Sequence, residues 1–82
     1  MLKPVLVKIE QIYIPTDRRK EIDLEKVDVV AEKIIAEISH PPIHVRKGKG
    51  RYVLVSGVHR LEARKALGEE IIEVIIVGAR LF

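Results

Sequence analysis

The segment Ser56-Gly57-Val58-His59-Arg60 carries the residue types in this chain that best suit the binding of an anion. It follows a β-branched run at residues 52–55 and precedes a helical pattern at residues 61–67. A small-residue corner between a strand and a helix leaves backbone N–H groups unpaired at the positive end of the helix dipole. His59 and Arg60 are cationic types of side chain in the first turn of the predicted helix, where the helix dipole favours acidic side chains. We therefore expect a bound anion at this corner, and a phosphate is the simplest one.

The residues before this corner predict a strand and a long helix. Apolar residues alternate from Val5 to Ile14, with a shift of phase that predicts a bulge or bend near Glu10-Gln11. Pro15 ends this strand, and the polar stretch Thr16–Ile22 is expected to be a loop. Asp23 is a candidate N-cap for a helix over Leu24–Ser39, in which apolar residues recur at helical spacing.

The second half of the chain predicts a hairpin, a helix and a strand. Pro41-Pro42 ends the long helix, and a hairpin over residues 43–55 turns at Lys47–Gly50. The helix after Ser56 ends at Leu67, where Gly68 suits the C′ position. Residues 71–77 are β-branched and form a last strand. The order strand, helix, hairpin, helix, strand predicts one α+β domain over residues 1–82, with a mixed sheet and two main helices.

The composition excludes several classes of protein. The chain has no cysteine, so it has no disulfide, thiolate nucleophile or sulfur-bound metal. Its hydrophobic fraction of 48% indicates an ordered domain rather than a disordered one. The sequence shows no signal peptide and no apolar run near the roughly 18 residues that span a bilayer. We therefore expect a cytoplasmic location and no membrane contact.

Lysine and arginine gather in three short stretches. These stretches hold ten of the fifteen basic residues, at positions 18–20, 46–51 and 60–65. Such clusters suit a nucleotide or the backbone of a nucleic acid, and they also suit simple solvation of loops and helix faces. Non-specific binding of nucleic acid is therefore an alternative function. The chain has no candidate recognition helix for reading duplex sequence.

The order and spacing of these pieces resemble the ParB/sulfiredoxin superfamily, from about Ile12 to Val77. The likeness rests on Lys26-Val27, Pro41-Pro42-Ile43 with Val45, and Gly57-Val58-His59-Arg60. In sulfiredoxins the equivalent corner reads Gly-Gly-Cys-His-Arg and binds the phosphates of ATP, and its cysteine is the reductase centre. Here Val58 stands at the cysteine position and Ser56 replaces the first glycine. The resemblance therefore implies a phosphate site without sulfinic acid reductase activity.

The same resemblance implies roles for particular side chains. Gly57, His59 and Arg60 would contact phosphate oxygens, and Lys26 would lie near the nucleotide. Partition proteins bind cytidine triphosphate and have an arginine-bearing loop after the first strand, a part that Arg18 or Arg19 could play. The implied phosphate and nucleotide set is Ser56, Gly57, Val58, His59, Arg60, Lys26 and Arg18, and the implied ligand is ATP, CTP or another nucleoside triphosphate.

Each of these side chains also has a purely structural interpretation. His59 can be a partly buried core histidine, and Gly57 can serve only the turn. Lys26 can be an exposed helix residue. Arg60 can pair with Glu62, Glu69 or Glu70 at the surface.

Catalysis is the least defined part of the expectation. Free-serine kinases share the His-Arg corner and carry a glutamate before the first helix. In this chain Asp17, Glu21 or Glu62 could bind Mg²⁺ or act as a base in slow hydrolysis or phosphoryl transfer, or be solvated surface acids. We expect no built-in metal site. A structural domain with an empty pocket is the remaining alternative.

Overall fold

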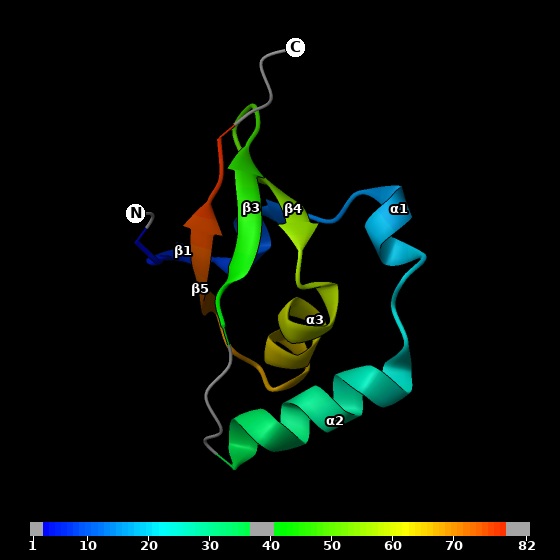
Figure 1. Cartoon of the computed structure of the whole chain (residues 1–82). Helices are drawn as coiled ribbons and strands as arrows, with labels where there is room; N and C mark the ends of the chain where they lie inside the picture. The colour runs from blue at the N-terminus through cyan, green and yellow to red at the C-terminus, as the bar shows by residue number, and fades with distance from the viewer. Residues whose placement is uncertain (1–2, 37–40, 79–82) are drawn as a thin grey trace.

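The computed structural model describes residues 3–36 and 41–78 and shows a small α+β domain, as the sequence predicts (Figure 1). Its strands are β1 (Val5–Lys8), β2 (Ile12–Tyr13), β3 (Ile43–Lys47), β4 (Tyr52–Ser56) and β5 (Ile71–Ile76). Its helices are α1 (Thr16–Arg19), α2 (Leu24–Ile35) and α3 (Val58–Ala66), and a 3-10 turn, η1, spans Ile9–Gln11. The predicted bend near Glu10-Gln11 is this 3-10 turn.

The strands within the described ranges form one mixed sheet in the order β1-β5-β3-β4-β2. β3 and β4 form the predicted antiparallel hairpin, and β5 lies parallel to β3 on its other side. β1 pairs antiparallel with β5, and the short β2 pairs parallel with β4. The hairpin therefore occupies the centre of the sheet, so the corner that follows β4 begins from its best supported part.

Helices α2 and α3 pack against each other at one end of the central strands, and α1 lies beside β4 (Figure 1). The core is aliphatic, because Ile43, Val45, Leu61 and Val74 have almost no exposed surface. No helix among the described residues has the length and apolar character needed to cross a membrane.

The prediction of a loop over Thr16–Ile22 is wrong for its first half, because residues 16–19 form the helical turn α1. Pro15 stands at the N-cap position, and its carbonyl accepts hydrogen bonds from the N–H groups of Arg18 and Arg19. Asp17 lies in the first turn and arginines lie in the last, an order that favours the helix dipole. This short turn carries side chains of both charges and lacks the apolar periodicity that identifies longer helices from sequence.

Helix α2 begins where the sequence predicts. The Asp23 carboxylate accepts a hydrogen bond from the backbone N–H of Glu25 at 3.0 Å, so Asp23 is the N-cap. The helix ends at Ile35 with Ala36 as its C-cap, which is earlier than predicted. Residues 37–39 of the predicted helix lie outside the described residues. Ile35 is mostly exposed and so is not on the buried face.

Gly57 is fixed by two independent requirements. Its φ of 99° lies in the left-handed region, where a side chain is strained. A Cβ atom at this position would also lie 2.6 Å from Cγ2 of Ile43, which is almost fully buried in β3. No other residue type satisfies both the turn and the close packing of α3 on the sheet. The glycine is therefore needed for the fold itself, whether or not a ligand binds.

Gly57→Ala should destabilise the protein more than Gly68→Ala does. Gly68 also has a positive φ, of 79°, but an added Cβ there meets no atom within 4 Å. We expect Gly68→Ala to cost about 1–2 kcal/mol from backbone strain alone. Gly57→Ala should cost about 1–3 kcal/mol more because of the clash with Ile43. Urea denaturation of the two variants measures the difference, and equal losses would show that the contact with Ile43 relaxes at no cost.

Candidate functional site

An open cleft of about 330 Å³ lies against the start of α3. It brings together six of the seven residues that the sequence assigns to a phosphate site, namely Arg18 and the run Ser56, Gly57, Val58, His59 and Arg60. Glu21, Val30 and Pro41 complete its lining. The walls thus come from α1, from Glu21 just after α1, and from α2. The segment before β3 and the corner between β4 and α3 form the rest.

The amino end of α3 meets this cleft without a cap from a side chain. Gly57 is the N-cap, no side chain accepts a hydrogen bond there, and the first turn holds no acid. The first N–H that bonds within the helix is that of Leu61, which donates to the Gly57 carbonyl at 3.0 Å. The preceding N–H groups are the ones that an anion can satisfy at a helix start.

His59 links the starts of the two main helices. Its Nε2 accepts a hydrogen bond of 3.0 Å from the backbone N–H of Asp23, the N-cap of α2. An imidazole that accepts at Nε2 carries its proton on Nδ1. His59 is half-buried, so the structural interpretation of this residue is partly correct. The Nδ1–H remains as the donor that the ring can offer to a ligand.

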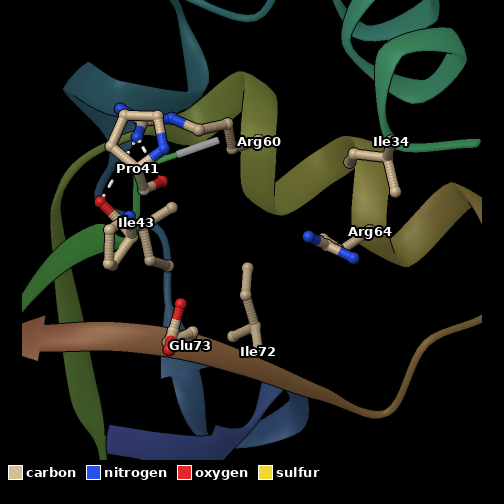
Figure 2. A pocket seen from close by; sticks show the side chains of 8 residues that line it. Ile34, Pro41, Ile43, Arg60, Arg64, Ile72 and Glu73 are labelled. Carbon is tan, nitrogen blue, oxygen red and sulfur yellow. Dashed lines mark hydrogen bonds between the residues drawn. The ribbon is translucent and has the colours of Figure 1, made fainter. Parts of the chain in front are cut away.

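Arg60 is also partly committed to the fold. Its Nη1 donates to the carbonyl oxygens of Pro41 at 2.6 Å and Pro42 at 3.2 Å (Figure 2, dashed lines). These bonds fix the guanidinium between α3 and the chain that enters β3. They replace the predicted alternative of pairing with Glu62, Glu69 or Glu70. A guanidinium has five N–H donors, so Arg60 can hold the carbonyls and still present others to a phosphate.

A smaller cavity of about 30 Å³ shares Arg60 and Pro41 with the cleft (Figure 2). Apolar side chains of Ile34, Ile43 and Ile72 line it from α2, β3 and β5. The charged side chains of Arg60, Arg64 and Glu73 line the rest of it. Its volume suits one or two water molecules and no nucleotide. The small cavity is therefore a gap in packing, and the open cleft is the candidate binding site.

Arg18 reaches the cleft from α1 together with Glu21. The Arg18 Nη1 and a carboxylate oxygen of Glu21 lie 2.7 Å apart, and both side chains are substantially exposed. Exposed pairs of this kind contribute little to stability, so Arg18 can exchange its partner at small cost. Of the three acids that the sequence offers as candidate bases or magnesium ligands, Glu21 lines the cleft, whereas Asp17 and Glu62 do not. Glu62 instead pairs with Lys65 at 3.0 Å on α3.

Val58 and Ser56 take different places at the corner. The Val58 side chain belongs to the hydrophobic core and is only 4% exposed, so only its backbone suits a ligand. Ser56 is the last residue of β4, and its hydroxyl pairs with Nδ1 of His44 at 3.2 Å. The sequence did not single out His44, because its role depends on the register of the β3–β4 hairpin.

Lys26 is not among the residues that line the cleft. It is exposed in the first turns of α2, in agreement with the alternative interpretation of an ordinary surface residue. The contributions of Val30 and Pro41 to the cleft carried no chemical signal in the sequence. Both depend on how α2 and the segment before β3 are placed, which is a matter of tertiary packing.

A comparison with models of protein families matches residues 3–80 to the ParB N-terminal domain. The chain belongs to the ParB N-terminal domain family. This finding confirms the predicted superfamily over nearly the whole sequence. A sequence comparison with curated proteins gave no match.

Solved structures extend this likeness. Sulfiredoxin from Arabidopsis thaliana is 31% identical, with a TM-score of 0.81, over 94% of this chain and 86% of that protein. ParB from Caulobacter crescentus, complexed with CTP-γ-S, has a TM-score of 0.81 at 21% identity. A free serine kinase in complex with AMP has a TM-score of 0.78 at 18% identity. The match covers 95% of this chain and 46% of the ParB chain, and 90% of this chain and 30% of the kinase chain, so these two likenesses concern the fold.

His59→Ala should lower the free energy of unfolding by about 1 kcal/mol, since it removes the acceptor for the Asp23 N–H. Lys33→Ala, an exposed change on α2, should stay within about 0.5 kcal/mol of the wild type. Urea denaturation compares the two variants. An unchanged free energy of unfolding for His59→Ala would mean that water accepts the hydrogen bond from the Asp23 N–H as well as the imidazole does.

Proposed function

We propose that this domain binds a nucleotide, with its phosphates at the amino end of α3. The observation that carries the proposal is the uncapped, acid-free start of α3 on an open cleft that also receives Arg18, His59 and Arg60. Backbone N–H groups, an arginine fork and an imidazole N–H together form a donor set that suits phosphate oxygens. The nucleotide complexes of ParB and the serine kinase, which share this fold, support the same proposal.

The preferred ligand is a nucleoside triphosphate, ATP or CTP, bound with Mg²⁺. Glu21 lies in the cleft and is the acid best placed to help hold a cation or accept a proton in slow hydrolysis or phosphoryl transfer. Reduction of a sulfinic acid forms no part of the proposal, because the chain has no cysteine.

Isothermal titration calorimetry with ATP, CTP and ADP in the presence of Mg²⁺ tests the proposal. Each lost charge-assisted hydrogen bond is worth about 1.5–3 kcal/mol, so Arg18→Ala and Arg60→Ala should each weaken binding by about tenfold to a hundredfold. Arg46→Ala, which changes an exposed residue of β3, is the control and should bind as the wild type does. The nucleotide affinity of Lys26→Ala shows whether that lysine contributes to binding although it lies outside the cleft.

Since Arg60 also holds the Pro41 and Pro42 carbonyls, its variant needs a separate measurement of thermal unfolding. Arg18→Ala avoids this complication because, among the described residues, the Arg18 side chain forms a hydrogen bond and ion pair only with the exposed Glu21. Affinities no tighter than millimolar for all three nucleotides, or identical titrations for wild type and Arg18→Ala, would sink the proposal.

A second candidate function is sequence-tolerant binding of a nucleic acid backbone by the tip of the β3–β4 hairpin. Arg46, Lys47, Lys49 and Arg51 are all exposed there. The Arg51 guanidinium lies 3.9 Å from the centre of the Tyr13 ring, which holds one cation in place at the edge of the sheet. This basic edge of the sheet lies outside the proposed nucleotide cleft. It therefore favours a second binding surface that is independent of the cleft.

Binding of duplex DNA at this edge should weaken steeply as salt rises, because phosphate contacts release counterions. Fluorescence anisotropy over a series of salt concentrations measures the slope of log affinity against log salt. Lys47→Ala or Lys49→Ala should each reduce that slope by about one, whereas Arg18→Ala should leave it unchanged. Absence of binding at low salt would exclude this candidate.

A further inference from the structure

A serine hydroxyl and an imidazole are paired at the edge of the proposed nucleotide cleft. Ser56 and His44 are register partners at the ends of β4 and β3, and Oγ of Ser56 lies 3.2 Å from Nδ1 of His44. His44 is exposed, so its ring can exchange protons with solvent. A hydroxyl held by a basic nitrogen is the arrangement that converts a weak serine nucleophile into an active one.

Ser56 also carries a nucleophilic hydroxyl among the residues that line the cleft. It directly precedes Gly57 and lines the cleft, in which it is the sole hydroxyl-bearing residue among the described lining. Val58, on the other side of Gly57, turns its side chain into the core. The β4–α3 corner therefore presents one oxygen nucleophile and the helix N–H groups to the same open space.

The geometry points to Ser56 as the acceptor of a phosphoryl group from a nucleoside triphosphate in the cleft, with His44 as general base. This inference rests on the proposed function. In the step, a bond forms between Ser56 Oγ and the γ-phosphorus, and the bond from that phosphorus to the β,γ-bridging oxygen breaks. The nucleoside diphosphate leaves with the electron pair. The Oγ proton passes to His44 Nδ1, in the tautomer whose own proton is on Nε2, and then to solvent.

The environment of Ser56 favours the phosphorylated product. A phosphoserine one residue before the N-cap places about two negative charges beside the amino end of α3, where the helix dipole stabilises them. Arg18 and Arg60 line the same space and carry compensating charge. The attached phosphate would occupy the position of a nucleotide phosphate, so each molecule reacts once and then binds nucleotide more weakly.

Incubation of the full chain with ATP and Mg²⁺, followed by intact mass spectrometry, tests the inference. We expect the mass to rise by one phosphoryl group, and fragmentation should place it on Ser56 rather than on the other hydroxyl-bearing residues, Tyr13, Thr16, Ser39 and Tyr52. Ser56→Ala should abolish the modification, and Ser56→Thr should retain it because the hydroxyl remains. His44→Gln should slow it by about 10²–10⁴-fold, since an amide can hold the hydroxyl but cannot take up its proton.

Lys33→Gln is the control, because it changes an exposed residue of α2 that lies outside the cleft and should react at the wild-type rate. Calorimetry with ATP on the wild type separates the two proposals. If ATP binds and no phosphoryl group appears on Ser56, the phosphoacceptor role is overturned and nucleotide binding stands. If ATP does not bind, both fail. Modification at another residue, or an unchanged rate for His44→Gln with thermal unfolding intact, also overturns the assignment.

Discussion

The close contact between Gly57 and Ile43 is the constraint on which the rest of this domain depends. Ile43 opens β3, the strand that pairs with both β4 and β5, and it is only 1% exposed. The backbone of the corner can lie against Ile43 only because Gly57 has no side chain. This contact sets the direction in which α3 leaves the sheet, and thereby decides which N–H groups meet the cleft. The position of α2 then follows from its packing on α3.

The side chains of the corner serve the fold and, in the proposed function, also bind the ligand. His59 holds the start of α2 through one ring nitrogen, and Arg60 holds the chain before β3 through one guanidinium nitrogen. Each side chain still has donors that these contacts do not use. A residue that is anchored in this way loses little conformational entropy when a ligand binds, so the structural contacts help to preorganise the site.

Much of this arrangement could be predicted from the sequence, because it rests on local patterns. Asp23 as N-cap, the turn between β3 and β4, and Gly57 and Gly68 at the ends of α3 all follow from turn and cap chemistry. The turn lies one residue later than the predicted Lys47–Gly50, because Lys47 still belongs to β3. Helix α1 was missed because four polar residues show no apolar period. The Asp23–His59 and Ser56–His44 pairs join residues that are distant in sequence. They depend on helix packing and on hairpin register, and a single sequence records neither directly.

The walls of the cleft come from segments spread over most of the chain, from Arg18 to Arg60. An occupant therefore cross-links the first helical turn, α2 and the central corner, and unfolding of any one of them releases it. A domain of this size has a small core and a modest stability of its own. A ligand at a hundred times its dissociation constant adds about 2.7 kcal/mol, a sizeable share of such a stability. The supply of that ligand in the cell would then help to determine how much of this protein is folded.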